Sequence, residues 1–174
     1  RLISVGKKIS TIPGNLNVHK TLRKIFDFKL QIFEKNKPVD WSTAETLAIG
    51  TLLTEGFSVR LSGQDSGRGT FSQRHAVLRS QDSHDRYVPL NNISSGQKKF
   101  EIIDTLLAEF AVLGFEFGYY LSEPETLGLR EAQVGEIESG EQVIRDQVIT
   151  AGESKCGRAS SLVRWRLHGE EEEG

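Results

Sequence analysis

The sequence IIDTLLAEFAVLGFEFGYYLSEPETL, residues 102–127, decides the fold. It predicts the longest helix of the chain, from Lys99 to Tyr120. One face of this helix, defined by a repeat of three or four residues, carries Ile102, Leu106, Glu109 and Leu113. Because the other three members of this stripe are apolar, the pattern directs the carboxylate of Glu109 toward the interior.

Upstream of this helix, the N-terminal part of the chain reads as a linker and one helix. Residues 1–15 contain two glycines and a proline, which indicates a linker. Apolar residues lie among lysines from Leu16 to Lys37 with the spacing of an amphipathic helix. Pro38 ends this helix, because the residue before a proline is disfavoured in the helical conformation.

A second helix and a strand follow. Ser42 begins the helix, with Glu45 three residues later in the capping-box position, and Gly56 ends it. Residues 57–62 are predicted to form a strand. The loop over residues 63–70 is rich in glycine and serine, and it lies at the carboxyl end of that strand, where open parallel sheets bind their ligands.

The remaining elements set the fold class. We expect a helix over residues 139–151 and further strands at 87–90, 127–132 and 162–167. Strands that alternate with helices predict a three-layer α/β domain with a mainly parallel sheet flanked by helices.

The chain is expected to form one domain with additions at both ends. Residues 1–37 are the linker and N-terminal helix, residues 38–169 the α/β domain, and residues 170–174 an acidic tail in solvent. A single core is usual for a chain of 174 residues.

Composition excludes several function classes. Lys and Arg number 22 against 24 Asp and Glu, a balance that argues against nucleic acid or an anionic membrane as a partner. No apolar run is long enough to cross a bilayer, and no targeting signal is visible. Cys156 is the only cysteine, which rules out a disulfide within the chain and a metal site with several cysteines.

Glu109 is the residue whose pattern suggests chemistry. Burial of a lone carboxylate favours its neutral form, because desolvation penalises the charge. A glutamate in that state can donate a proton, whereas a helix glutamate that reaches water has no such role. If it is buried without a partner, replacing Glu109 by Gln or Leu should stabilise the fold by about 1 kcal/mol. Glu116 lies near the same stripe and is a weaker candidate.

Two segments carry a resemblance to a known family. The stretch over residues 102–127 and RLSGQDSGRGTFSQRHAVL, residues 60–78, resemble the first component of the 2-oxoglutarate dehydrogenase complex, a thiamine-diphosphate-dependent decarboxylase. The resemblance covers nearly the whole chain and is strongest over residues 38–127. It implies a transketolase-like, pyrimidine-binding domain. It also implies that Glu109 activates the cofactor by protonating its aminopyrimidine ring.

The resemblance also implies a substrate-side loop. Four residues of the second segment match the family loop that faces the active-site cleft: Gln64, Asp65, Arg68 and His75. Without the resemblance, a lone histidine such as His75 reads as a surface or boundary residue.

Cofactors and partners follow from the same resemblance. In the family, Mg²⁺ and the diphosphate of thiamine diphosphate are held by another domain, through a Gly-Asp-Gly motif that this sequence lacks. We therefore expect no metal site and no bound cofactor in this chain. The family partners are a diphosphate-binding domain, a second subunit and a lipoyl-bearing acyltransferase, in the cytoplasm or the mitochondrial matrix.

Several positions depart from the family pattern. Val134 and Ile137 stand where the family carries aromatic residues, one of which stacks on the aminopyrimidine. At the cofactor-binding position Ile137, an aliphatic side chain offers no such stacking. Charged residues replace apolar ones at Arg130, Glu141 and Arg145. This suggests that a subunit interface of the family has become a solvent-exposed surface.

The last strand departs in the same way. Residues 162–167 alternate arginines with apolar residues, whereas a central strand of a covered parallel sheet should be almost entirely apolar. One face of this strand is therefore expected to be uncovered or polar.

Two functions remain open. In the first, the chain is an excised, engineered pyrimidine-binding domain that is monomeric and inactive alone, because charges at a seam oppose association. In the second, it is a half-site subunit that forms an active 2-oxo acid decarboxylase with a separate diphosphate-binding chain.

Overall fold

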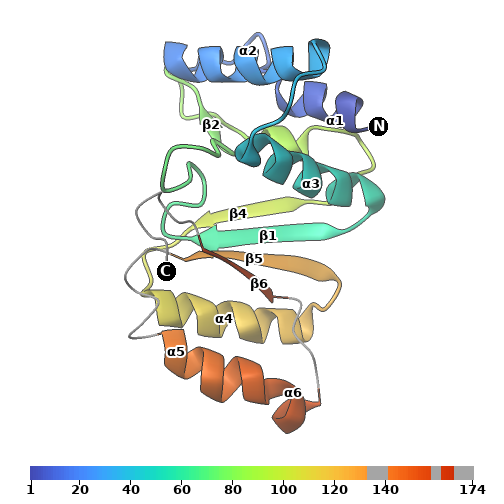
Figure 1. Cartoon of the computed structure of the whole chain (residues 1–174). Coiled ribbons are helices and arrows are strands. Elements are labelled where there is room, and N and C mark those ends of the chain that lie inside the picture. Colours follow the sequence, from blue (N-terminus) through green and yellow to red (C-terminus); the bar gives the residue numbers. More distant parts are fainter. Residues whose placement is uncertain (133–140, 158–161, 167–174) are drawn as a thin grey trace. The chain divides into compact units, whose positions relative to one another are not determined.

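A computed structural model describes residues 1–132, 141–157 and 162–166 of the chain, drawn in Figure 1. Two compact units make up the chain. The first comprises Arg1–Phe57 and Gly67–Phe100, and the second comprises Ser58–Ser66 and Glu101–Gly174. The described part contains no helix that is long and apolar enough to cross a membrane.

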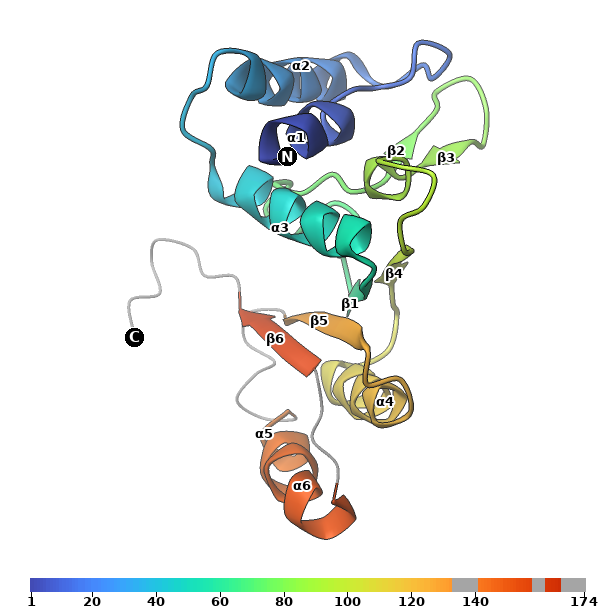
Figure 2. The ribbon, with the colours of Figure 1, turned by 90° about the vertical axis from the view of Figure 1, so that its right-hand side faces the viewer.

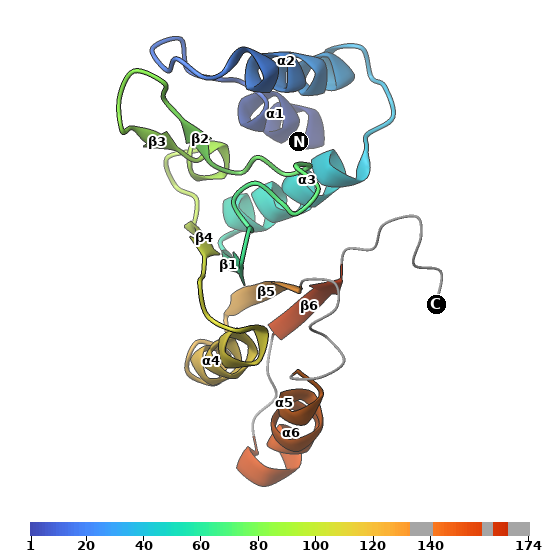
Figure 3. The same cartoon turned by 90° about the vertical axis from the view of Figure 1, so that its left-hand side faces the viewer.

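The first unit is mainly helical, with α1 (Leu2–Ile9), α2 (Lys20–Glu34) and α3 (Trp41–Glu55). Helix α1 packs against both other helices, and Figure 3 shows it between them. An antiparallel pair of short strands, β2 (Leu78–Arg79) and β3 (Arg86–Tyr87), and a 3-10 turn, η1 (Pro89–Asn91), belong to the same unit. The predicted strand at 87–90 is therefore wrong beyond its first residue.

Helix α1 corrects the predicted linker over residues 1–15. Its side toward the other helices buries Val5, Gly6 and Ile9. A Cβ atom at Gly6 would overlap the ring of Phe33 on α2, so glycine here permits a close approach of two helices. The sequence interpretation treats this glycine only as a helix breaker, which is why it misses α1.

Helix α3 agrees with its prediction in extent but not in its cap. The side chain of Asp40, rather than that of Ser42, accepts the backbone N–H of Thr43 at 2.8 Å. Glu45 makes an ion pair elsewhere in its unit, so the predicted capping box does not form. Gly56 ends the helix in the left-handed conformation, with φ of 99°, as the sequence predicts.

The second unit contains the main sheet. Its strands are β1 (Ser58–Gly63), β4 (Phe100–Asp104), β5 (Thr126–Ala132) and β6 (Leu162–Arg166), in the order β4-β1-β5-β6. Strands β1 and β5 pair in parallel, as do β5 and β6. The predicted α/β class with a mainly parallel sheet is confirmed. Among the described strands β6 lies at the edge of the sheet. The requirement that a central strand be almost entirely apolar therefore does not apply to its alternating sequence.

Helix α4 (Glu109–Ser122) follows β4 and corrects the predicted helix over 99–120. Residues 100–104 are strand, and Leu106 is fully exposed in the connection. The stripe that joins Ile102 and Leu106 to Glu109 therefore does not exist. A short apolar run with two adjacent isoleucines fits a strand as well as a helix, and periodicity alone selects the wrong one here.

The helices of the second unit lie against the sheet and against one another. Helix α4 packs on β1, β5 and β6, and α5 (Glu141–Ile144) packs on α4, as Figure 2 shows for α4 and α5. A π-helical turn, η2 (Arg145–Ile149), leads into α6 (Thr150–Cys156). The predicted helix over 139–151 is confirmed from residue 141 onward. Its first two residues, and the predicted acidic tail at 170–174, lie outside the described residues.

We predict that Gly128 sets the distance between α4 and the sheet. A Cβ atom at Gly128 on β5 would overlap the buried ring of Tyr120 on α4. Gly128→Ala should therefore lower the free energy of unfolding by about 1–3 kcal/mol, the usual cost of overpacking, as measured by urea denaturation. Gly118→Ala is the matched control, because Gly118 lies on the same helix with no atom near its Cβ position. That control should be neutral or stabilise by up to about 1 kcal/mol, and an equal loss in both variants would contradict the prediction.

Candidate functional site

The candidate site lies where α4 begins. Glu109 is the first residue of the helix and follows Ala108, whose carbonyl oxygen accepts the backbone N–H of Val112 at 3.1 Å. The side chain of Glu109 is only 5% exposed. The sequence therefore predicts its burial correctly, although the helical stripe on which that prediction rested is absent.

Arg130 of β5 is the partner of Glu109. Its guanidinium forms an ion pair with the Glu109 carboxylate, and its Nη2 also donates to the backbone carbonyl oxygen of Glu109 at 3.1 Å. The Arg130 side chain is 0% exposed. The expectation that Arg130 belongs to a wet surface is wrong, because it lies in the interior and is bound to Glu109.

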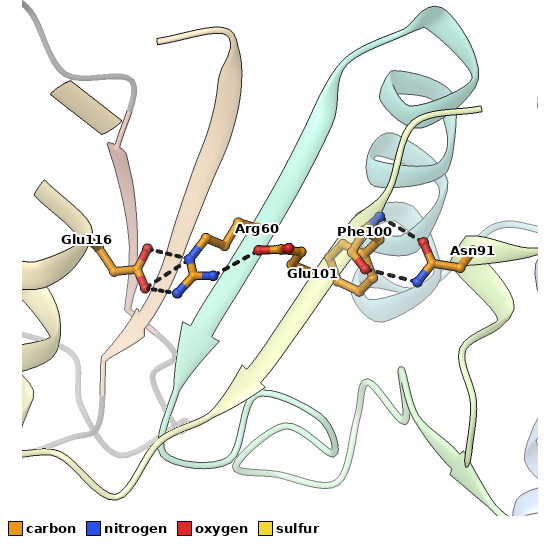
Figure 4. A network of polar contacts seen from close by, with 5 residues as sticks. All are labelled: Arg60, Asn91, Phe100, Glu101 and Glu116. Atoms are coloured by element: carbon orange, nitrogen blue, oxygen red, sulfur yellow. Dashed lines mark hydrogen bonds and ion pairs between the residues drawn. The ribbon is translucent and has the colours of Figure 1, made fainter. Parts of the chain in front are cut away.

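A second arginine holds the same helix two turns further on. Arg60 of β1 donates from Nε and Nη2 to the carboxylate of Glu116 at 2.9–3.1 Å. Its Nη1 donates to Glu101 of β4 at 2.9 Å. Figure 4 shows Arg60 between these two carboxylates. Burial alone would lower the pKa of Arg60, but hydrogen bonds and charge from Glu116, with Glu101, raise it above its ordinary value.

Aromatic rings enclose this second ion pair. The Arg60 guanidinium carbon lies 4.8 Å from the ring centre of Tyr119 and 5.8 Å from that of Phe115, both distances for cation–π attraction. Tyr120 is also close to Glu116, and burial together with that carboxylate raises the pKa of its hydroxyl. Glu116 thus links α4 to β1 through Arg60. Its predicted contact with a cofactor stays a prediction.

The predicted substrate-side loop is divided between the two units. Gln64 and Asp65 belong to the second unit, where Gln64 is exposed and Asp65 half-buried. Arg68 and His75 belong to the first, and Arg68 donates to the hydroxyl of Ser72 at 3.0 Å. Their role toward a substrate stays a prediction.

His75 lines a small cavity of the first unit. The cavity, about 20 Å³, holds at most a water or so. Lys29 also lines it, and burial lowers the pKa of Lys29, partly offset by Asp40 and Glu45. Glu45 itself is bound to the buried Arg74. A substrate does not fit this space, so the cavity carries no catalytic role for His75.

The arrangement around Glu109 can be compared with what an aminopyrimidine ring needs. The ring requires a carboxyl group that can give it a proton, whereas this carboxylate is already bound to a buried cation. Within the described residues, no other hydrogen-bond donor reaches either of its oxygens. Ile137, the predicted ring contact, lies outside the described residues. As arranged, the side chains that are described do not fit the pyrimidine of thiamine diphosphate.

Two features of the site are not found from the sequence. The sequence interpretation gives Arg60 no role and assigns Arg130 to a surface. The available signal is the presence of an arginine in each of two strands of a parallel sheet, whose residues are normally apolar. The complementary signal is a pair of glutamates seven residues apart on the helix that lies between these two strands in the sequence.

The ion pair also reverses the expected effect of removing Glu109. The predicted stabilisation by Glu109→Leu assumes a carboxylate without a partner. Since Arg130 is buried beside it, the replacement would remove this carboxylate from a buried cation, and loss of one partner of a buried pair is destabilising. The condition for the predicted gain in stability is therefore not met, and a loss is expected instead.

Comparisons with known proteins bear on this site. Residues 37–174 match the family described as "Transketolase, pyrimidine binding domain". The chain is 49% identical over 173 residues to the "2-oxoglutarate dehydrogenase E1 component" of Brucella anthropi. It is 48% identical over 173 residues to the proteins of that name from Brucella ovis and Brucella canis. Each alignment covers 99% of this chain but only 17% of the relative's length.

We predict that the Arg60 network contributes unequally to stability through its two carboxylates. The Glu116 side chain is 2% exposed and that of Glu101 35%, so only the first has lost nearly all its contact with water. Glu116→Gln should lower the free energy of unfolding by about 3 kcal/mol, as for a broken buried pair. Glu101→Gln is the control within the same network and should cost less than about 1 kcal/mol. Urea denaturation measures both, and equal losses would contradict the assignment.

Proposed function

Since the chain belongs to the family of transketolase pyrimidine-binding domains, we propose that it is the pyrimidine-binding part of a 2-oxoglutarate dehydrogenase-like enzyme. In this proposal the complete enzyme decarboxylates a 2-oxo acid with thiamine diphosphate and Mg²⁺. The chain alone is a monomer without catalytic activity. The engineered origin expected from the charged positions forms part of the same proposal.

The position of Glu109 is the observation that carries this proposal. A carboxylate buried to 95% at the start of a helix, above the sheet, is uncommon and requires a charged partner. Its position in the sequence corresponds to the glutamate to which the family resemblance assigns cofactor activation. Retention of such a residue is typical of a site that evolved for chemistry rather than for stability.

The incompleteness of the site supports inactivity of the chain alone. The sequence contains no Gly-Asp-Gly motif for the diphosphate and its metal. Among the residues that the structure describes, no cluster of His, Cys, Asp or Glu could hold a metal ion. A second protein domain must supply these groups before the proposed reaction can proceed.

A half-site subunit is the second candidate, and the surface beside Glu109 favours it. Leu106 and Leu107 lie just before the N-cap residue of α4, and Phe110 follows Glu109; all three are exposed. We call these three residues the apolar rim. Exposed apolar side chains that lie close in sequence to a buried polar group are typical of a surface that another protein covers. In this reading the apolar rim binds a separate diphosphate-binding chain.

Further partners and the cellular site belong to the proposal as well. The complete enzyme would have a second subunit and a lipoyl-bearing acyltransferase that accepts the acyl group. It would work in the cytoplasm or the mitochondrial matrix. These partners are proposed from the likeness to the named relatives. The chain itself spans only 17% of the length of those relatives.

We predict that the purified chain gives no turnover of 2-oxoglutarate with thiamine diphosphate and Mg²⁺. The groups for the diphosphate are missing from its sequence, so the cofactor has only half of a site. The measurement is carbon dioxide release with an artificial electron acceptor, and turnover by the pure chain would contradict the proposal.

We predict further that the apolar rim decides whether the chain associates. Light scattering should give the mass of a monomer for the chain alone. Addition of a diphosphate-binding domain from one of the named relatives tests the half-site candidate: a complex that Leu107→Asp weakens about tenfold or more supports it. Phe71→Asp is the matched control, because Phe71 is equally exposed but lies in the other unit. Equal effects of both substitutions, or no complex at all, would contradict the half-site candidate and favour the first candidate, a monomer that is inactive alone.

A further inference from the structure

Three observations on the second unit bear on the protonation state of Glu109. The carboxylate is buried, it lies at the first position of α4, and it contacts the guanidinium of Arg130. Burial alone would favour the neutral acid, but a cation in direct contact favours the carboxylate. The N-terminal end of a helix also favours negative charge. Two effects thus oppose burial, and an arginine remains protonated throughout the ordinary pH range.

The geometry also holds Arg130 in place beside Glu109. Its Nη2 binds both the side chain and the backbone carbonyl oxygen of Glu109, and the arginine has no contact with water. The guanidinium therefore cannot swing into solvent without moving β5 or α4. A charge pair in such surroundings is expensive to separate, because each buried ion would lose the opposite charge in direct contact with it.

The other described charged side chains on the neighbouring strands have partners of their own. On the strands that pack against this helix, the other described arginine facing it is Arg60, which is bound to Glu116 and Glu101. Residues alternate sides along a strand, so Glu131 points to the sheet face opposite that of Arg130, and it has its own interactions. Arg130 is thus the cation that acts on Glu109 among the described side chains.

We propose that Arg130 is a built-in counter-ion that holds Glu109 as a carboxylate and thereby prevents it from donating a proton to a bound pyrimidine. The inference rests on the proposed function for the identity of the proton acceptor. It explains how a chain can retain the family's glutamate and yet lack its chemistry. The contact is autoinhibitory, because Arg130 already binds the Glu109 carboxylate and a cofactor ring would have to displace this arginine.

The direct test is carbon-13 NMR of the full chain with labelled glutamate carboxyl groups. Comparison with Glu109→Gln assigns the Glu109 resonance. In the parent chain it should report a carboxylate at neutral pH. In Arg130→Met, where the cation is lost and burial remains, it should report the carboxylic acid at the same pH. A protonated Glu109 in the parent chain, or an unchanged resonance in Arg130→Met, would overturn the proposal.

Two further variants guard against a fold that fails. Arg79→Met removes an exposed arginine of the other unit and should leave the Glu109 resonance unchanged. If Arg130→Met unfolds, the double variant Glu109→Gln/Arg130→Met should regain the fold, since no buried ion is left. Failure of the double variant to regain any stability over the single one would show that Arg130 acts through its shape rather than its charge, against the proposal.

Titration with thiamine, and with thiamine diphosphate and Mg²⁺, separates this inference from the proposed function. By calorimetry, Arg130→Met should bind thiamine about tenfold or more tightly than the parent, and the added Glu109→Gln should remove the gain. If Glu109 becomes protonated in Arg130→Met but no variant binds thiamine, the counter-ion role stands and the pyrimidine-binding function is wrong. If the parent binds as tightly as Arg130→Met, Arg130 does not mask the site.

Discussion

The second unit depends on one arrangement: two glutamates of α4 bind two arginines from neighbouring strands. Glu109 and Glu116 are separated by two helical turns and so share one side of the helix. Their partners Arg130 and Arg60 lie on β5 and β1, which pair directly. One ion pair fixes the start of the helix and the other fixes its middle. Together they determine both the direction of α4 across the sheet and its position along it, which apolar contacts alone would define less strictly.

This arrangement has a cost in stability that apolar packing does not have. Buried ion pairs seldom stabilise a fold more than well-packed apolar residues of the same size would, but they penalise every alternative in which one partner is left alone. Around them, Val112, Leu113 and Phe117 bury their side chains in the ordinary way. The apolar residues thus supply most of the driving force, while the ion pairs select one register for α4.

The sequence predicts the elements that depend on local pattern and fails where two distant segments meet. The extents of α3 and β5 follow from turn residues and short apolar runs, and the predictions match. The long helix fails because Ile102 and Ile103 fit a strand equally well, and the neighbouring strand β1 lies about forty residues earlier in the chain. Glu109 illustrates the same limit at the site. Its burial can be predicted, but its partner Arg130 lies on another element, and only the fold brings the two together.

The two ion pairs differ in one respect that decides what each can do. Arg60 also binds Glu101, whose side chain is partly exposed, so this network reaches water and can adjust its charges there. The pair of Arg130 and Glu109 is sealed from water, and neither partner can be neutralised or released cheaply. A carboxyl group that must pass a proton to a ligand needs a partner that comes and goes. Here the partner is part of the sheet. The residue that the proposed chemistry requires and the residue that holds α4 in place are thus the same glutamate, and in this chain Arg130 commits it to the fold.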